Sequence, residues 1–318
     1  MGFKEKWKFL TYGMHLERCP IFLASARGKQ IPLLKTLLSN ACINNCLFCP
    51  YRNERRIVRT IWKKEELVNL TIKLTKNRKI NGLFLSSGIM KDPDFTVEKQ
   101  IEVVEELRKL GYQNYIHLTL MPGVNIDLMK RAVELSNRVG INIEFPSQDY
   151  YDEVKLYLSF KQDVLKRLKL LSRIVEHYRR QGKKVDLVTQ FIVGVREESD
   201  REILEMTEYL YRKLKVKRVY YSAFEPIPKT PLENKKPESK KREIKLYRAS
   251  FLIRDYGFSY KDFEYDEKGN LIHEDPKDSI KFEVKEKYEF KDLLKVKNFG
   301  INRAKRIGGN YSLLKFLN

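Results

Sequence analysis

Apolar residues recur along this chain with two alternating spacings. Short runs rich in β-branched and aromatic residues alternate with longer charged stretches in which apolar residues stand three or four positions apart. The strand-like runs lie near 33–39, 83–86, 115–120, 141–145, 187–193 and 219–223. Helical spacing is found at 63–74, 97–111, 125–140, 150–180, 199–214 and 239–256. Strands that alternate with helices predict parallel βα units.

Six such units predict an α/β fold, namely a partial (βα)6 TIM-like barrel that is open on one side. Gly111 and Gly140 stand where the caps of the second and third helices are expected. In barrels of this kind the chemistry lies at the carboxyl ends of the strands. The segments that follow each strand are therefore the places to search for functional residues.

The composition of the chain changes after residue 258. The stretch 259–284 is polar and rich in turn residues, with a Gly269–Asn270 turn, and 289–309 reads as two short helical pieces joined by a tight turn. We expect an N-terminal extension (1–30), a barrel (31–258), and a connector followed by a small α-helical domain (259–318).

Length and composition favour a soluble protein. The chain has 318 residues, of which 42% are hydrophobic, enough for a packed core. No apolar run approaches the roughly 18 to 20 residues that span a bilayer, and residues 1–10 lack the apolar core of a signal peptide. We expect a cytoplasmic protein that does not bind membranes.

The chain is strongly basic. It contains 63 Lys and Arg against 42 Asp and Glu, a formal net charge of +21. Such a field attracts polyanions such as nucleic acid. A lineage that favours lysine on solvated surfaces gives the same balance, so charge alone does not decide between the two.

Three of the four cysteines lie within eight residues. Cys42, Cys46 and Cys49 form a C-x3-C-x2-C pattern directly after the first predicted strand, and such clustering in a cytosolic chain indicates a metal site. Three thiolates can bind three irons of a cubane cluster and leave the fourth iron open to another ligand. The alternatives are structural thiols or a zinc site, although no fourth Cys or His stands at zinc-like spacing. Cys19 is a further ligand, a redox partner or an ordinary buried thiol.

The segment LLKTLLSNACINNCLFCPYR resembles the cluster motif of the radical S-adenosylmethionine (SAM) superfamily. The resemblance implies a [4Fe-4S] cluster held by Cys42, Cys46 and Cys49, with SAM on its open iron. It also implies reductive cleavage of SAM to a 5'-deoxyadenosyl radical that takes hydrogen from a substrate. Phe48 occupies the aromatic position that packs near the adenine in this superfamily.

Further positions resemble the SAM-binding elements of the superfamily. After the second strand, Ser87 and Gly88 are expected to bind the SAM amino group through backbone carbonyls, although Ile89 replaces the usual glutamate there. Glu144 suits the ribose hydroxyls, with an ion pair inside the barrel as the alternative. The fifth strand approximates G-x-I-x-G-x-x-E, and the resemblance gives the adenine contacts to Ile192, Gly194 and Ser222, with Glu197 as the acidic member of the motif.

The segment LLKVKNFGINRAKRI is similar to a helix-hairpin-helix motif, whose turn binds a nucleic-acid phosphate through backbone amides. Asn298 replaces the first turn glycine, which asparagine can do because it enters the left-handed region readily. Five packing positions are expected: Leu294, Val296, Phe299, Ala304 and Ile307. Eight positions are expected to bind nucleic acid: Lys295, Lys297, Asn298, Gly300, Asn302, Arg303, Lys305 and Arg306. The alternative is a protein-packing hairpin with basic flanks.

Together these segments, with GLFLSSGI, HLTLMPG, TQFIVG and YYSAFEPIPKTPLEN, are similar to the DNA modification/repair radical SAM proteins with a C-terminal helix-hairpin-helix. Those proteins are often encoded beside a uracil-DNA-glycosylase-like protein. The resemblance implies a role in DNA, or less readily RNA, modification or repair. It also implies an electron donor such as ferredoxin or flavodoxin, and the glycosylase-like protein as a partner.

Three hypotheses follow. The first is radical chemistry on nucleic acid that the tail brings to the barrel mouth. The second keeps the radical chemistry but has a small-molecule or protein substrate, with the hairpin as a structural cap. The third is a nucleic-acid-binding protein whose Fe–S cluster is not catalytic.

Overall fold

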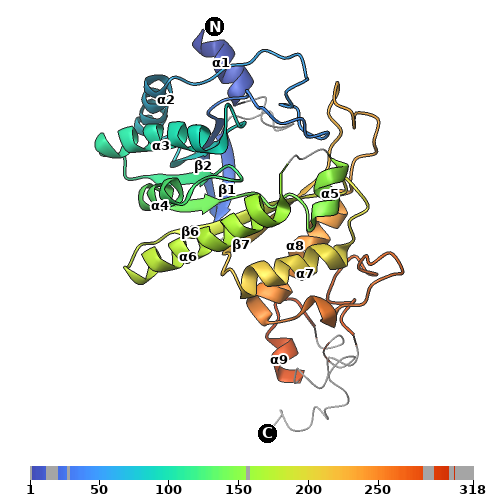
Figure 1. The fold of residues 1–318 in the computed structure, drawn as a ribbon. Helices are drawn as coiled ribbons and strands as arrows, with labels where there is room; N and C mark the ends of the chain where they lie inside the picture. Colours follow the sequence, from blue (N-terminus) through green and yellow to red (C-terminus); the bar gives the residue numbers. More distant parts are fainter. Residues whose placement is uncertain are drawn as a thin grey trace. The chain divides into compact units, whose positions relative to one another are not determined.

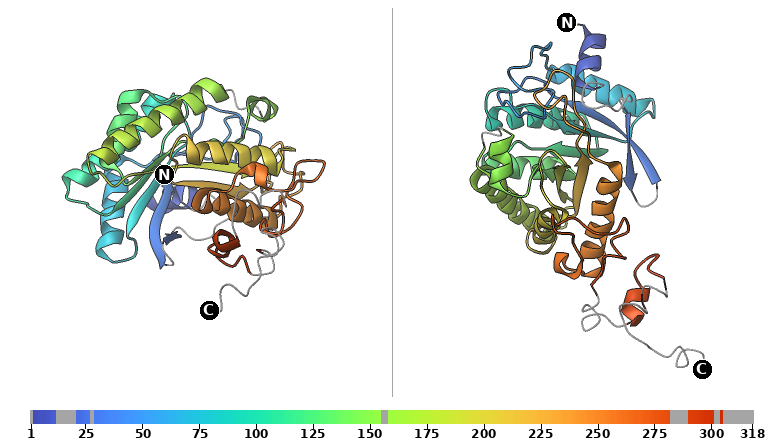
Figure 2. Two further views of the ribbon diagram at one scale, coloured as in Figure 1. Left: turned by 90° about the horizontal axis from the view of Figure 1, so that it is seen from below. Right: turned by 90° about the vertical axis from the view of Figure 1, so that its right-hand side faces the viewer.

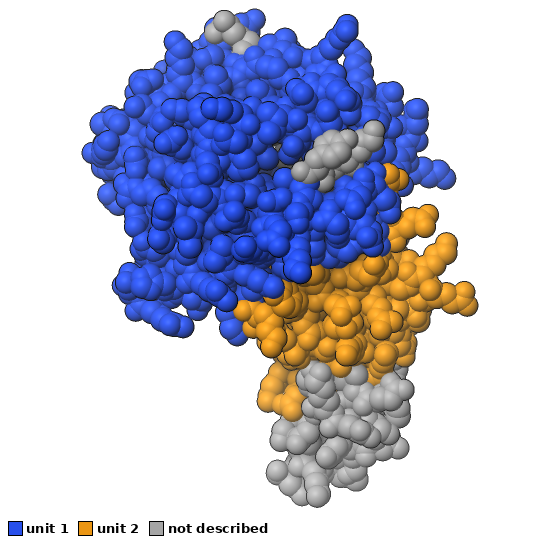
Figure 3. Space-filling model, in the orientation of Figure 1, with its two compact units in different colours: residues 1–190, 214–218, 226–236 blue, residues 191–213, 219–225, 237–318 orange. Residues whose placement is uncertain are grey.

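The computed structural model describes residues 2–11, 21–26, 29–154, 158–281, 290–300 and 304. The chain forms two compact units, coloured separately in Figure 3. Unit 1 comprises residues 1–190, 214–218 and 226–236, and unit 2 comprises residues 191–213, 219–225 and 237–318.

A seven-stranded sheet carries the fold, with its strands ordered as they occur in the chain (Figure 1). Neighbouring strands pair in parallel from β2 to β6, whereas β1 pairs with β2 in the antiparallel sense. The strands are β1 (Ile21–Ala26), β2 (Lys29–Leu37), β3 (Gly82–Ser86), β4 (Tyr115–Thr119), β5 (Arg138–Gly140), β6 (Asp186–Val193) and β7 (Arg218–Ala223). Parallel strands in sequential order, each followed by a helix, are the arrangement of a βα barrel.

The helices of unit 1 lie on the outer side of its strands (Figure 2). They are α1 (Phe3–Leu10), α2 (Lys64–Lys76), α3 (Pro93–Lys109), α4 (Ile126–Leu135), α5 (Gln148–Glu153) and α6 (Lys166–Arg180), the last preceded by a π-helical turn, Phe160–Leu165. Helices α2, α3, α4 and α6 pack one against the next. Gly111 follows α3 with φ +79°, so the predicted cap at this glycine is confirmed.

Unit 2 contains α7 (Asp200–Arg212), α8 (Lys240–Tyr256), a 3-10 turn (Tyr260–Asp262) and α9 (Phe290–Leu294). Helices α7 and α8 pack together. Each begins after a serine whose hydroxyl accepts a backbone N–H of the first turn, Ser199 from Glu202 and Ser239 from Lys241. Both helices therefore start where the sequence places their caps.

The fourth parallel strand was predicted wrongly. It is formed by Arg138–Gly140 and not by 141–145, because α4 already ends at Leu135. Gly140 is a strand residue and not a helix cap. A Cβ at this position would lie 2.4 Å from the carbonyl oxygen of Val188 on β6, so only glycine allows the two strands to approach this closely.

The segment before the first predicted strand adds β1 and α1 to unit 1. Thr36 on β2 donates its hydroxyl to the carbonyl of Leu10 at 3.1 Å and accepts the indole N–H of Trp62 at 3.1 Å. Lys6 forms an ion pair of 2.5 Å with Glu66 on α2. Helix α1 is therefore tied to both β2 and α2.

One row of side chains crosses the parallel strands at equal height. The register aligns Lys35, Phe84, His117 and Arg138, which therefore share one face of the sheet. The rings of Phe84 and His117 stack with centroids 4.3 Å apart, and burial lowers the pKa of His117 well below its usual value. Arg138 pairs with Asp186 at 2.9 Å. These side chains pack against one another on one face of the sheet, before the carboxyl ends of the strands.

Candidate active site

The loop that carries Cys42, Cys46 and Cys49, called the cysteine loop, begins at the carboxyl end of β2. It runs beside the segment that follows β3. The N–H of Gly88 donates to the carbonyl of Ser39 at 2.8 Å, and the N–H of Ile43 donates to the carbonyl of Ile89 at 2.8 Å. A Cβ on Gly88 would stand 2.4 Å from the Ala41 carbonyl oxygen and 3.1 Å from Cys42 Cβ. Gly88 therefore lies directly beside the first cysteine, and Ser87 precedes it with its hydroxyl 2.8 Å from the Gly88 carbonyl oxygen.

All three cysteines of the motif are free thiols on this loop. Cys46 is buried, and Cys42 and Cys49 are half-buried. The N–H of Tyr51 donates to the Cys49 sulfur at 3.4 Å. Burial raises the pKa of Cys46, and the charges of Cys49 and Cys42 raise it further; burial raises the pKa of Cys49 to about 12. The three sulfurs are close enough to influence one another electrostatically.

Arg59 holds the cysteine loop together. Its guanidinium donates to five backbone carbonyls: Asn40 at 2.6 Å, Tyr51 at 2.8 Å, Arg52 at 2.6 Å, Arg55 at 3.0 Å and Asn53 at 3.4 Å. Burial lowers the pKa of Arg59, while Cys42 and Cys49 act to raise it. In the sequence only the basic run after the last cysteine points to Arg59, which was not predicted to belong to the site.

The segment after β5 packs against the same loop. The N–H of Leu47 donates to the carbonyl of Val154 at 3.0 Å, and the rings of Phe48 and Phe145 meet edge to face with centroids 5.8 Å apart. The hydroxyl of Tyr151 donates to the carbonyl of Ile143 at 2.5 Å. Phe48 is thus fixed between the cysteines and the segment that carries Glu144.

Glu144 is a buried carboxylate in a strained position. Its φ is +52°, and its N–H donates to the carbonyl of Gln190 at 2.9 Å. Asn142 donates to Oε1 at 3.0 Å, whereas Oε2 is buried without a hydrogen-bond partner in the described part of the chain. Burial raises the pKa of Glu144 to about 7, and its charge acts to raise the pKa values of Cys46 and Cys49. Glu144 therefore lies within electrostatic reach of the cysteines.

Ile192, Gly194 and Ser222 belong to unit 2, where Ile192 and Ser222 are half-buried on β6 and β7. Gly194 has φ +84°, and a Cβ there would lie 2.4 Å from Oε2 of Glu238. In the structure the side chain of Glu238 therefore occupies the space that a side chain at Gly194 would need.

The glutamate that closes the turn after β6 is Glu198. Its carboxylate accepts the N–H of Gly194 and, at 2.9 Å, the N–H of Arg196, and its side chain is buried. Glu197, which the motif comparison selected, is exposed. The spacing of two adjacent glutamates does not reveal which of them turns inward.

Arg242 on α8 anchors this turn from within unit 2. Its guanidinium donates to Asp200 Oδ1 at 2.7 Å, to Glu238 Oε2 at 2.7 Å and to the Glu198 carbonyl at 2.5 Å. Burial acts to lower the pKa of Arg242, but Asp200 and Glu238 raise it overall. Asp200 is fully buried and also accepts the N–H of Leu271 at 3.0 Å.

The described part of the tail contains a tight turn after α9. Asn298 and Gly300 both have positive φ, +58° and +83°, and the N–H of Ala304 donates to the carbonyl of Gly300 at 3.1 Å. Leu294 was predicted to be a packing residue but is 43% exposed, because α9 turns Leu293 inward instead. The predicted packing positions Val296, Phe299 and Ala304 are buried.

Several predicted residues lie outside the described part of the chain: Cys19, Asn302, Arg303, Lys305, Arg306 and Ile307. Within the described part, Lys297 is exposed, and Lys295 forms an ion pair of 2.7 Å with Asp292. No described helix has the length and apolar character needed to cross a bilayer.

A model of the Radical SAM superfamily matches residues 36–210, more than half of the chain and all of the cysteine loop. The chain belongs to this superfamily. It is therefore an enzyme, and the hypothesis of a non-catalytic Fe–S protein is set aside. The cofactors of the superfamily are a [4Fe-4S] cluster and SAM, as the cysteine motif implied.

Individual relatives agree with this placement. Biotin synthase of Rickettsia felis is 27% identical over 211 residues, which cover 64% of this chain and 63% of that protein. The chain thus spans slightly less than two thirds of this relative. Methylornithine synthase (PylB) matches with a TM-score of 0.56 and 20% identity over 72% of this chain and 65% of that one. HydG of Carboxydothermus hydrogenoformans matches with a TM-score of 0.55 and 20% identity over 70% of this chain and 51% of that one. These structures confirm the partial barrel.

The residues present fit these cofactors. In a cubane each thiolate binds a different iron, so the three sulfurs need not converge on one ion, and no three His, Cys, Asp or Glu side chains do so among the described residues. Cys42, Cys46 and Cys49 would hold the cluster, which when bound supplies the electron that cleaves SAM. The absence of a side chain at Gly88 lets its backbone lie directly against the backbone of Ala41 and against Cys42. Glu144 Oε2, which has no hydrogen-bond partner among the described residues, offers an acceptor near the cysteines.

Proposed function

We propose that this radical SAM enzyme acts on nucleic acid, in DNA or, less readily, RNA modification or repair. The observation that carries the proposal is the charge of +21, from 63 basic against 42 acidic residues, in a chain with a basic turn at residues 295–306. Phosphate neutralisation by Lys and Arg supplies most of the affinity of proteins for nucleic acid. The sequence similarity to radical SAM proteins of DNA modification and repair points in the same direction.

The geometry of the turn after α9 supports a helix-hairpin-helix. Such a turn needs positive φ on both sides of one buried apolar residue, and Asn298 and Gly300 flank Phe299 in this way. Lys297 is exposed beside it. The backbone amides after Gly300, with Asn302, Arg303, Lys305 and Arg306, would then contact phosphate without reading bases.

Two protein partners complete the proposal. A one-electron carrier such as ferredoxin or flavodoxin would reduce the cluster. A uracil-DNA-glycosylase-like protein would act on the same nucleic acid, as the gene neighbourhood of similar proteins suggests. Mixing either purified partner with this chain and measuring 5'-deoxyadenosine would test each one separately.

The decisive experiment measures SAM cleavage by anaerobically reconstituted, reduced protein with and without DNA or RNA. We expect nucleic acid to increase the yield of 5'-deoxyadenosine, DNA more than RNA, and the increase to disappear in Lys297→Glu/Arg303→Glu. Lys109→Gln, an exposed position on α3, serves as the charge control. Cleavage that no nucleic acid changes, with wild type and variant alike, would refute the proposal.

A second candidate is a small-molecule substrate with the tail as a structural cap. It is favoured by the relatives named biotin synthase and methylornithine synthase, whose names denote small products. In this case SAM cleavage responds to a small molecule, and the tail variants change stability but not turnover. The experiment above separates the two candidates.

A further inference from the structure

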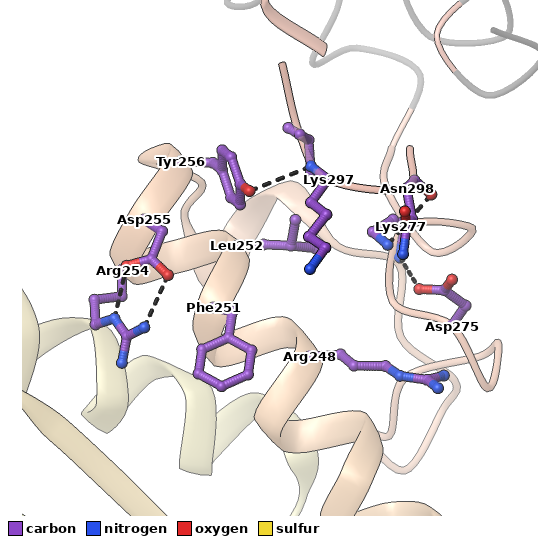
Figure 4. Close-up of a pocket in the computed structure, with 11 residues that line it drawn as sticks. Arg248, Phe251, Leu252, Arg254, Asp255, Tyr256, Asp275, Lys277, Lys297 and Asn298 are labelled. Carbon is purple, nitrogen blue, oxygen red and sulfur yellow. Dashed lines mark hydrogen bonds and ion pairs between the residues drawn. The ribbon is translucent and has the colours of Figure 1, made fainter. Parts of the chain in front are cut away.

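A cavity of about 520 Å³ opens in unit 2 beside the basic turn. Three segments line it: the second half of α8, the loop at Asp275 and Lys277, and the turn from Val296 to Asn298 (Figure 4). Its volume lies within the range of about 300 to 1,000 Å³ that is usual for pockets that bind small organic groups. A single nucleotide belongs to this size class.

Positive charge dominates the lining. Arg248, Arg254, Lys277 and Lys297 face only two acidic residues, Asp255 and Asp275. Arg254 is neutralised by both carboxylate oxygens of Asp255, at 2.7 and 2.8 Å. Arg248 and Lys297 are exposed and form no ion pair with any described residue, and Lys297 extends toward Phe251 and Arg248 in Figure 4. Two cations are thus free to meet an anion.

Two aromatic rings stand among these cations. Phe251 is half-buried and carries the guanidinium of Arg254 at 4.9 Å from its ring centroid. The hydroxyl of Tyr256 accepts the backbone N–H of Lys297 at 3.2 Å, which ties the turn to the end of α8. Aromatic rings beside free cations are the combination by which proteins hold single-stranded nucleic acid, with a base on the ring and phosphates on the cations.

We propose that this cavity holds one unpaired nucleotide of the bound strand, with its base against Phe251 and its flanking phosphates on Arg248 and Lys297. The inference rests on the proposed function and deepens it. The turn would anchor the backbone without regard to sequence, while the cavity would select an unpaired base. The enzyme would accordingly prefer single-stranded or locally opened nucleic acid.

The test measures the affinity of the full-length protein for a fluorescein-labelled DNA strand, for its duplex, and for the same strand with abasic sites. We expect wild type to bind the single strand more tightly than the duplex. Phe251→Leu, which keeps apolar volume, is expected to weaken single-strand binding by about fivefold or more, since base stacking on aromatic rings has that magnitude. The abasic strand should bind wild type and Phe251→Leu alike.

Arg248→Gln tests the phosphate contact. We expect the slope of log affinity against log salt concentration to fall by about 0.7 for the single strand. Lys109→Gln, the matched charge control, should leave both affinity and slope unchanged, and thermal unfolding should show that all variants are folded.

The outcomes separate the two proposals. Tight binding of nucleic acid by wild type that neither Phe251→Leu nor Arg248→Gln changes would overturn the cavity proposal and leave the proposed function standing. An equal loss for the intact and abasic strands in Phe251→Leu would also overturn it, because stacking needs a base. No binding by wild type, together with SAM cleavage that nucleic acid does not change, would overturn both.

Discussion

Two arginines each hold a loop at the end of a strand, and their charges are balanced in opposite ways. Arg242 in unit 2 meets two carboxylates, those of Asp200 and Glu238, and its pKa is raised. Arg59 in unit 1 donates to backbone carbonyls and to no carboxylate in the described part of the chain, and its pKa is lowered. The charge of Arg242 is therefore balanced by carboxylates, whereas Arg59 keeps a positive charge beside Cys42 and Cys49.

In the part of the chain that the structure describes, the surroundings of Arg59 contain unfavourable groups that the surroundings of Arg242 lack. Around the cysteine loop lie a buried carboxylate oxygen without a partner, on Glu144, and a left-handed non-glycine residue, again Glu144. Such costs persist where a site must bind something that compensates them. Among the described residues, the side chains of Arg242, Asp200 and Glu238 have no buried polar atom without a hydrogen-bond partner, and they serve the stability of unit 2. Substitutions in the two regions should therefore separate function from stability.

The largest effect is expected at Cys46. Cys46→Ala should abolish the [4Fe-4S]⁺ signal of reduced protein in electron paramagnetic resonance, because two thiolates cannot replace three. In wild type the signal should change when SAM is added. The far-ultraviolet circular dichroism of the variant should match wild type. Cys19→Ala is the control and should retain the signal; a full cluster in Cys46→Ala would contradict the assignment.

The next effect concerns Asp200. Asp200→Asn removes the buried charge that pairs with both Arg242 and Lys245, and Glu238 remains as a carboxylate partner of Arg242. The loss of one member of a buried ion pair costs about 3 to 5 kcal/mol of unfolding free energy, which sets the upper limit of the expected effect. Urea unfolding measures this loss. Glu274→Gln removes an exposed partner of Lys241 and should be indistinguishable from wild type. Cluster content per folded protein should not change in Asp200→Asn, and a selective loss of iron would break the comparison.

Arg59→Gln should combine both kinds of effect. It leaves several loop carbonyls without a donor, for which about 1 to 3 kcal/mol of stability is expected to be lost. Because the loop carries all three cysteines, iron content after reconstitution should also fall. Arg56→Gln, an exposed neighbour, is the matched control. Lower stability with undiminished iron would assign Arg59 a purely structural role.

The last effect is a gain in stability at Glu144, and it is confined to pH values above the ordinary pKa of a glutamate. Its pKa is raised by burial from 4.5 to about 7, so the folded protein holds a proton that the unfolded chain releases, and stability falls as the pH rises between these values. Glu144→Gln should therefore stabilise the cluster-free protein at pH 8, by up to about 3 kcal/mol, and leave it unchanged near pH 4.5. Urea unfolding at both pH values measures the difference, with Glu197→Gln as the exposed control. A difference independent of pH would refute the assignment.

Much of the fold could be predicted because its signals are local. The helices at 63–74 and 199–214 appear nearly as expected, since their apolar spacing and caps lie within each segment. The strand at 141–145 was misplaced because its position depends on a contact 48 residues away: Gly140 lies against the backbone of Val188. An apolar run does not reveal such a close approach.

The site divides in the same way. Cys42, Cys46 and Cys49 are recognisable because their spacing is itself the chemical signal. Arg59 and Arg242 are not, because each is defined by partners that only the folded chain brings together; Arg242 meets Asp200, for example, across 42 positions. In the tail, the turn at Asn298 was identified by its similarity to a helix-hairpin-helix motif, in which asparagine can replace the first glycine. Leu294 was predicted to pack in place of Leu293 because the phase of a helix only five residues long is not fixed by the sequence.

Helix α8 carries both Arg242, which anchors the turn after β6, and Phe251, which lines the cavity. Arg242 lies in its first turn and Phe251 in its second half, so the helical rise of about 1.5 Å per residue sets their separation and the twist of about 100° sets their relative direction. The helix therefore fixes the distance between the turn after β6 and the cavity lined by Arg248 and Phe251. One alanine inserted after Tyr247 would keep Arg242 in place while rotating Arg248 and Phe251 away from the cavity, so the spacing itself becomes a property that can be varied.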